Sequence, residues 1–251
     1  MNKIIPLLLV VLLASSCSFD KPLTFEKQSF TSDDFEDCIS NNCPTINVQV
    51  LKAPHDDEKS LLVNEAVEKH IMDIIVSARE NNEGIVTIRE ALQSFINDFR
   101  KYETEFGNDF LSYDADIFMN VSYQSEQLVS LDVNYYLFTG GAHGYSGTNF
   151  LNFDAQTGTK LSHTDLFTDT EAILAHAEKK FRDSYQIPED RNINATGFWF
   201  EKDTFHFPEN IGFTENEIVL HYNQYEIASY AEGPITLSIP KQEIAQFLKF
   251  Q

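Results

Sequence analysis

The sequence predicts an α+β fold, in which an antiparallel sheet is packed by two long N-terminal helices and a third central helix. Two segments, 58–80 and 88–106, carry apolar residues every three or four positions, as amphipathic helices do. Apolar and polar residues then alternate through much of 117–153, which indicates strands. A third helical segment, 169–185, precedes further strands. Helices and strands in separate blocks are typical of the α+β class.

The amino terminus has the pattern of an export signal. Lys3 provides a positive charge, residues 4–13 form a short apolar run, and small residues then precede Cys17. The run is too short for a membrane-spanning helix, which needs about 20 residues. A cysteine directly after small residues resembles the bacterial lipobox, in which the thiol is acylated and the chain is cut before it. We therefore expect residues 1–16 to be a signal peptide and Cys17 to anchor the protein through acyl chains such as palmitate, unless the signal is an ordinary cleaved one.

The composition of the chain limits its class and its partners. A hydrophobic fraction of 42%, with 21 Phe and 10 Tyr, excludes a disordered chain, and the length suffices for a large core. The formal net charge of −21 repels nucleic acid and anionic lipid head groups, so we expect no nucleic acid as a partner. The same charge would attract a cationic partner. Acidic surfaces also keep proteins soluble, so the charge alone identifies no ligand.

Two further cysteines, Cys38 and Cys43, lie close together in the chain. Outside the cytoplasm, such a pair is typical of a disulfide that closes a small loop. The stabilisation is expected to be modest, because short loops lose little entropy on closure. A two-cysteine metal site is the alternative, but no second pair accompanies it at a metal-ligand spacing.

The first predicted elements follow the anchor in order. Residues 17–37 are expected to form a lipidated tether and a first strand. Residues 45–51 alternate apolar and polar side chains and predict a second strand, which ends before the polar cluster 54–57. The helix at 58–80 then presents one apolar face. The members of this face are Val63, Val67, Ile71, Ile74 and Ala78.

The second long helix, 88–106, has recognisable signals at both ends. Thr87 and Glu90 form a capping-box pattern at its start, and Gly107 is its expected stop. Its buried stripe is expected to comprise Ile88, Leu92, Phe95, Phe99 and Tyr102.

Three strands are predicted in the middle of the chain. Residues 117–123 and 129–137 alternate apolar and polar side chains, and their short connection predicts a hairpin. A third strand is expected at 149–153, before the turn-forming residues 154–158.

The last predicted elements are one helix, two strands and a short terminal helix. The helix at 169–185 begins with a second capping-box pattern, Thr168 and Glu171. The strands are expected at 218–222 and 235–239. A short helix over 240–250, with Pro240 in its first turn, completes the chain.

A glycine-rich segment at the end of a Tyr-rich strand is the first candidate for binding. It follows Tyr136 and contains Gly140, Gly141, His143 and Tyr145. The two glycines permit positive φ, and successive amides in such a turn can hold an anion. His143 could then act as a base or a donor. The alternative is a tight strand connection in which His143 makes a structural hydrogen bond.

A second candidate segment begins at the end of a later strand. It comprises His221, Tyr222, Tyr225, Glu226 and Tyr230 within 221–234. Tyrosines combine an apolar ring with a polar tip and so suit the recognition of proteins and sugars. The alternative is a packed cap over the sheet.

Together, these segments resemble a family of extracytoplasmic domains. A Tyr-rich strand leads into Gly-Gly-Ala-His at 140–143, and Tyr-Glu-Ile-Ala-Ser-Tyr-Ala-Glu-Gly-Pro follows at 225–234. Both are similar to the domain of the lysozyme-sensing anti-sigma factor RsiV and to the non-catalytic domain of the peptidoglycan deacetylase PdaC. Cys43-Pro44 before Ile-Asn-Val at 46–48 resembles the N-terminal half of the same unit.

The resemblance implies one α+β unit over residues 38–251, with halves at 38–110 and 111–251 and no catalytic residues of its own. It also implies a binding role, since signalling members of this family bind lysozyme, a cationic protein. The chain shows no segment like a cytoplasmic anti-sigma domain and no polysaccharide deacetylase domain. Signalling through a sigma factor is therefore not expected.

The patterns of known enzymes are weak in this sequence. Gly144-Tyr145-Ser146-Gly147 lacks the glycine spacing of a nucleophile elbow, and there is no His-Glu-x-x-His zinc helix. His143 and His221 both follow strands and could meet in space, with Glu226 as a third metal ligand. We nevertheless expect no metal, no cofactor and no catalytic residue.

The sequence therefore predicts an exported lipoprotein, on the periplasmic side or the cell surface, with a non-catalytic domain that binds a lysozyme-like cationic protein or peptidoglycan. One alternative is an envelope glycan hydrolase or deacetylase that uses His143 and His221. Another is a structural envelope protein without a soluble ligand. The expected binding residues are Tyr136, Gly140, Gly141, His143, Tyr145, His221, Tyr222, Tyr225, Glu226 and Tyr230.

Overall fold

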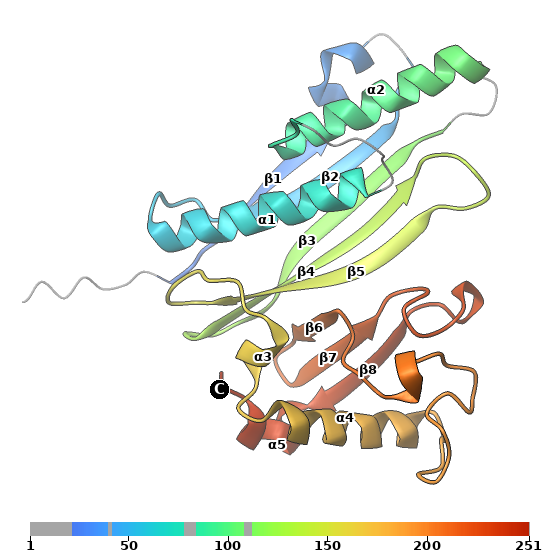
Figure 1. Cartoon of the computed structure of the whole chain (residues 1–251). Coiled ribbons are helices and arrows are strands. Elements are labelled where there is room, and N and C mark those ends of the chain that lie inside the picture. The colour runs from blue at the N-terminus through green and yellow to red at the C-terminus, as the bar shows by residue number, and fades with distance from the viewer. Residues whose placement is uncertain (1–21, 40–41, 78–83, 108–111, 251) are drawn as a thin grey trace, which may run out of the picture.

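The computed structural model describes residues 22–39, 42–77, 84–107 and 112–250 (Figure 1). The predicted signal peptide and Cys17 lie outside these residues, as does the end of the first predicted helix after residue 77. None of the helices within the described ranges combines the length and the hydropathy of a membrane-spanning segment.

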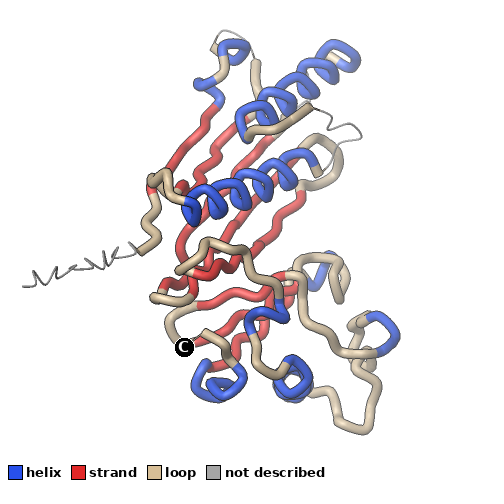
Figure 2. The backbone as a smooth tube through the Cα atoms, turned by 60° about the vertical axis from the view of Figure 1, so that its left-hand side comes forward, coloured by secondary structure: helices blue, strands red, loops and turns tan. Residues whose placement is uncertain are grey.

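The α+β prediction is confirmed, with the strands divided between two sheets (Figures 1 and 2). The five-stranded sheet contains β1 (Glu26–Thr31), β2 (Thr45–Lys52), β3 (Asp114–Gln124), β4 (Leu128–Phe138) and β5 (Tyr145–Asp154), in that order. Two long helices, α1 (Glu58–Val76) and α2 (Ile88–Phe106), lie across one of its faces. The three-stranded sheet contains β6 (Asn210–Phe213), β7 (Glu217–Tyr222) and β8 (Ile235–Pro240), and packs with α4 (Thr170–Ser184). Two single-turn helices, α3 (His163–Leu166) and α5 (Lys241–Ile244), flank α4 and β8. Single-turn 3-10 helices occupy Ser32–Asp34, Glu36–Cys38, Glu201–Asp203, Tyr230–Glu232 and Ala245–Phe247.

The five-stranded sheet is mixed rather than wholly antiparallel. Strands β2 and β3 run parallel, with Thr45 opposite Asp114 and Val48 opposite Ile117. The two long helices between these strands carry the chain back to the same end of the sheet, as a parallel pairing requires. The other neighbouring strands pair antiparallel, including the predicted β3–β4 hairpin.

The helix ends show where local sequence signals hold. Helix α2 begins and ends as predicted: Glu90 N donates to Thr87 Oγ1 at 3.2 Å, Thr87 N donates to Glu90 Oε2 at 3.0 Å, and Gly107 has φ +80°. The capping box predicted for α4 was wrong by one position. Asp169 caps this helix instead, since its carboxylate accepts from Ala172 N at 3.0 Å.

Two other boundaries differ from the prediction. Strand β5 starts at Tyr145, so this residue belongs to a strand rather than to the glycine-rich turn. The terminal helix is shorter than expected, because α5 ends at Ile244 and is followed by a 3-10 turn. Strand β6 was not predicted: its four residues are all buried and are too few to show a period.

Each sheet has its own core. Apolar side chains of α1 and α2, among them Ile71, Leu92 and Phe95, pack on the inner face of the five-stranded sheet. The second core lies between α4 and the three-stranded sheet, and Phe181 makes ring contacts with Phe200 there at 5.2 Å. Burial of these aromatic and aliphatic groups is the main stabilising term for both units.

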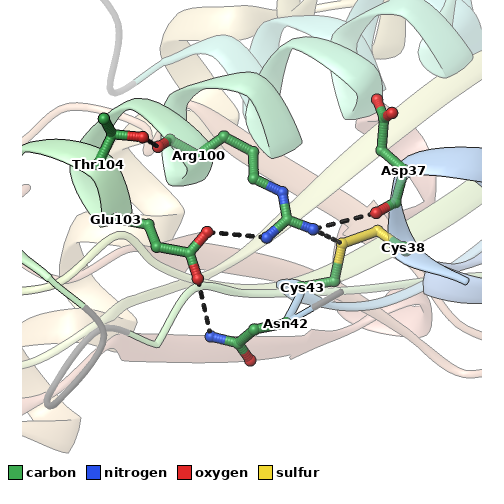
Figure 3. Close-up of polar contacts among 7 residues, drawn as sticks. All are labelled: Asp37, Cys38, Asn42, Cys43, Arg100, Glu103 and Thr104. Atoms are coloured by element: carbon green, nitrogen blue, oxygen red, sulfur yellow. Dashed lines mark hydrogen bonds and ion pairs between the residues drawn. A yellow bond between two sulfur atoms is a disulfide. The ribbon is translucent and has the colours of Figure 1, made fainter. Parts of the chain in front are cut away.

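The predicted disulfide between Cys38 and Cys43 is present, and Arg100 of α2 fixes its loop (Figure 3). Arg100 Nη2 donates to Asp37 O at 3.0 Å and approaches Cys43 Sγ at 3.4 Å. Arg100 Nη1 donates to Glu103 Oε2 at 2.9 Å, which orients the guanidinium. The segment between β1 and β2 is therefore held against α2 by charge-assisted hydrogen bonds.

The two sheets are joined at the edge strand β5. Asn152 Nδ2 donates to Ile211 O at 2.7 Å, and Phe150 N donates to Asn210 Oδ1 at 3.3 Å. The ring of Phe150 packs directly over the backbone of Gly212. The smaller sheet thus covers one end of the outer face of the five-stranded sheet and leaves the other end open.

Candidate functional site

The open end of the outer sheet face carries a regular pattern of side chains. In β4, Val133 and Leu137 point toward the helices and are buried, whereas Asn134 and Tyr136 point outward. Strand pairing places Asp116 opposite Tyr136 and Phe118 opposite Asn134. An aromatic and a polar side chain therefore lie side by side at both positions.

This face forms one wall of a hollow that we call the sheet-face groove. The hollow has a volume of about 320 Å³. Its lining residues are Asp116, Phe118, Asn134, Tyr135, Tyr136, Ser146, Gly147, Thr148, His221, Asn223 and Pro234. Strands β3, β4 and β5 contribute the first eight of these, and the second sheet with its loops contributes the rest. Tyr136 and His221, which come from the two predicted segments, thus line the same groove.

Asn223 holds the second sheet against the edge of β5. Its Oδ1 accepts from Thr148 N at 2.9 Å, and its Nδ2 donates to Thr148 O at 3.0 Å, so the amide pairs with β5 as another strand would. Glu226 supports this wall, because its carboxylate accepts from Asn223 N at 2.9 Å and from Glu209 N at 2.8 Å. Burial raises the pKa of Glu226, and these two backbone bonds oppose the rise.

The two predicted segments also touch beyond the groove. The ring of His143 stacks on Tyr230 with centroids 4.4 Å apart and planes inclined by 26°. Tyr225 lies 5.5 Å from Tyr230 and is 53% exposed. The glycines of the β4–β5 turn adopt the positive φ that their identity permits, +90° at Gly140 and +93° at Gly141.

Of the five predicted tyrosines only Tyr136 lines the groove, and two of the others, Tyr222 and Tyr145, lie well away from it. Tyr222 is fully buried in the second core, and its hydroxyl donates to His206 O at 2.6 Å. Tyr145 lies on the helix side of β5, 6.1 Å from Tyr135 and 40% exposed. Neither side chain lines the hollow.

The histidines have structural partners. His221 is 9% exposed, and its Nδ1 forms a hydrogen bond with Thr236 Oγ1 at 2.9 Å. Burial lowers the pKa of His221, and the Asn223 side chain partly opposes this. His143 Nδ1 donates to Gly144 O at 2.9 Å. Within the described ranges, no three histidine, cysteine, aspartate or glutamate side chains converge as metal ligands.

Nine of the eleven lining residues were not among the predicted binding residues, and three of them, Asp116, Phe118 and Asn134, lie on the open sheet face. Their alternation with buried neighbours marks them as outward-facing, but every sheet has such positions. These residues form part of a groove only because this end of the face stays open and His221 and Asn223 of the second sheet lie beside it. The groove therefore offers aromatic faces and hydrogen-bonding groups, which suit recognition of a ligand.

Comparison with known proteins divides the chain into two matched segments. Residues 39–146 match the family described as "Deacetylase PdaC", and residues 164–242 match "Protein of unknown function (DUF3298)". The chain is 27% identical over 144 residues to the peptidoglycan-N-acetylmuramic acid deacetylase PdaC of Bacillus subtilis (strain 168). That match covers 53% of this chain and 30% of the relative, so the chain spans less than a third of its length.

Two solved structures share the fold over nearly the whole chain. A DUF3298 family protein from Pseudomonas aeruginosa has a TM-score of 0.64 and 23% identity, and the match covers 92% of this chain and 96% of that one. A family member from Bacteroides fragilis has a TM-score of 0.63 and 20% identity, with 90% and 94% covered. The five-stranded sheet with its two long helices and the three-stranded sheet with α4 therefore occur together in other bacterial proteins.

Proposed function

We propose that this chain, which carries a PdaC domain at residues 39–146 and a DUF3298 domain at residues 164–242, binds cell-wall glycan in its sheet-face groove without cleaving it. The observation that carries the proposal is the pairing of aromatic with polar side chains on the open face. Phe118 and Tyr136 are each 38% exposed, and Asn134 and Asp116 lie opposite them.

This pairing complements the chemistry of a sugar ring. A pyranose presents apolar C–H groups on its faces and hydroxyl or amide groups around its rim. Aromatic rings cover the faces, while carboxylate and amide side chains exchange hydrogen bonds with the rim. The volume of about 320 Å³ is at the lower end of the range of roughly 300–1,000 Å³ for small-molecule sites. It therefore suits part of a longer glycan.

The relative from Bacillus subtilis supports peptidoglycan as the glycan, since its name states that it acts on that polymer. The same likeness, together with the Cys38–Cys43 disulfide, supports a location outside the cytoplasm. We further propose that Cys17 is acylated. The acyl chains would anchor the protein to a membrane and so hold the groove close to the cell wall.

A sedimentation assay with insoluble peptidoglycan tests the proposal. Tyr136→Ala removes the central aromatic face of the groove, so we expect at least a tenfold loss of binding. Tyr145→Ala is the matched control, because Tyr145 is similarly exposed but lies on the other side of the sheet. If the purified chain does not pellet with peptidoglycan, or if Tyr136→Ala pellets like the unaltered chain, the proposal is wrong.

A second candidate ligand is a cationic protein such as lysozyme. The observation that favours it is a set of carboxylates, Asp114, Asp116 and Asp132, at outward positions of β3 and β4 in a chain with a net charge of −21. Such binding would weaken steeply with salt, because screening shortens the reach of these charges. Binding to glycan by stacking would change little. Titrations with lysozyme and muropeptides at low and high salt therefore separate the two candidates.

A further inference from the structure

A second cavity, which we call the edge cavity, lies on the other side of the joint between the two sheets. It has a volume of about 530 Å³ and is bordered by α1, the edge of β5, the start of α3 and β6. Its polar lining includes His70, Asn149, Lys160, His163 and Glu209. It shares no lining residue with the sheet-face groove.

Apolar side chains form the rest of the edge cavity. Phe150, Leu151, Leu161 and Ile211 contribute to its wall. The volume lies within the range of roughly 300–1,000 Å³ that small-molecule sites occupy. The cavity can therefore hold a small organic ligand with a polar and an apolar part.

The hydrogen bond of His70 and the burial of both histidines disfavour a positive charge on either ring. Asn149 Nδ2 donates to His70 Nε2 at 3.0 Å, which requires this ring nitrogen to be unprotonated. Burial and the charge of Lys160 lower the pKa of His70 to about 4. His163 Nε2 donates to Glu209 O at 3.1 Å, and burial lowers the pKa of His163.

Lys160 is then the cation of the edge cavity. No ion pair joins Lys160 to a carboxylate of the described residues, and the nearby carboxylate of Asp73 is bonded to Lys69 at 2.7 Å. Lys160 is exposed at the mouth of the cavity, where partial removal from water and the nearby charge of Lys69 lower its pKa. An anion beside Lys160 would favour its charged form.

We infer that the edge cavity binds a small ligand through a monovalent carboxylate that pairs with Lys160. One cation balances one negative charge, whereas a phosphate dianion would leave an excess of negative charge beside Glu209 and Asp73. The apolar wall then accommodates the carbon part of the ligand. The carboxylate could belong to a free small acid or to an acidic sugar of the cell wall.

Titration calorimetry on the purified full chain tests this inference with four probes: D-lactate, N-acetylmuramic acid, N-acetylglucosamine and inorganic phosphate. We expect one or both acids to bind, and the neutral sugar and phosphate to bind at least tenfold more weakly. Binding of lactate as tight as that of the sugar acid would identify a free acid as the ligand. Binding of the sugar acid alone would identify a cell-wall sugar.

The variant Lys160→Met retains most of the side-chain volume and removes the charge, so we expect acid binding to weaken at least tenfold. Lys179→Met on α4 is the matched control, because it removes the same charge from an exposed position paired with Asp183. Lys160→Gln and the Asn149 side-chain amide signal in NMR provide a second readout if Lys160→Met fails to fold. The ligand should shift this signal in the unaltered chain and not in Lys160→Gln.

Several results would overturn the inference: no acid binds, phosphate binds more tightly than both acids, or Lys160→Met binds the acid like the unaltered chain. Loss of acid binding in Tyr136→Ala but not in Lys160→Met would place the acid in the sheet-face groove and also overturn it. The proposed function is tested separately. Its readout is the loss of peptidoglycan sedimentation in Tyr136→Ala, which does not depend on whether the acids bind at Lys160.

Discussion

The ring of His143 stacks on the ring of Tyr230 and so joins the β4–β5 turn to the segment that follows β7. The two residues are 87 positions apart in the chain and lie in connections of different sheets, His143 between β4 and β5 and Tyr230 between β7 and β8. With Asn223 and Thr148, they tie the second sheet to the edge of the first. The groove between the sheets depends on this junction.

Removal of the stacked His143 ring should weaken the contact between the two sheets. It should not affect ligand binding directly, because His143 does not line the groove. We expect His143→Ala to lower the free energy of unfolding by about 0.5–1.5 kcal/mol, the usual contribution of an aromatic pair. Urea denaturation measures the change. His143→Phe, which keeps a ring in place, should recover most of the loss. A glycan-cleaving activity that disappears in both variants would instead support the hydrolase alternative.

Close packing at the joint makes Gly212 sensitive to substitution. An added methyl group at Gly212 would overlap the ring of Phe150, so the ring or the strand must move. We expect Gly212→Ala to destabilise the protein by about 1–3 kcal/mol, as overpacking does. Thermal unfolding tests this. The double variant Gly212→Ala/Phe150→Leu should be more stable than Gly212→Ala alone, and the absence of such rescue would show that the contact is not the cause.

The partly buried imidazole of His70 should make stability depend on pH. Its pKa is about 4 in the folded chain against 6.5 in the unfolded one, so the unfolded chain binds a proton first as the pH falls. Above pH 6.5 the titration of His70 therefore does not change the free energy of unfolding. Between pH 6.5 and 4 it lowers the free energy of unfolding by roughly 1–3 kcal/mol. The charges around it are Lys160, Lys69 and Asp73.

Urea denaturation of the unaltered chain and of His70→Gln at several pH values isolates this effect. The variant keeps an acceptor for Asn149 but cannot titrate. The free energy of unfolding of the unaltered chain, minus that of His70→Gln, should therefore decrease as the pH falls from 7 to 4. A constant difference would mean that His70 binds protons equally in both states.

The proposed acylation of Cys17 predicts that the protein is found in the membrane fraction. Cys17→Ser cannot carry the thioether-linked lipid, so we expect it to lose labelling by palmitate and to leave the membrane fraction. Cys38→Ser/Cys43→Ser is the control, since it removes the disulfide and leaves the anchor in place. Equal labelling of the unaltered chain and Cys17→Ser would exclude the lipobox interpretation.

Local patterns in the sequence were sufficient for most elements. The ends of helix α2 and its capping box were predicted correctly, because the hydrogen bonds of Thr87 and Glu90 involve only neighbours in the chain. The buried stripe predicted for α2 was wrong at Tyr102, which is 45% exposed. The β3–β4 hairpin followed from alternation and a short connection. The predicted tyrosines divided between surface and core, because ring chemistry alone does not tell Tyr136 from Tyr222.

The sequence by itself determined the α+β class, the helix and strand segments and the pairing of Cys38 with Cys43, since each depends on periodicity or on close spacing. Tertiary structure alone decided the parallel β2–β3 pair, the division into two sheets and the meeting of Tyr136 with His221 in one groove. The physical reason is that alternation assigns side chains to a face of a strand, whereas packing between distant segments determines which part of that face stays open to a ligand.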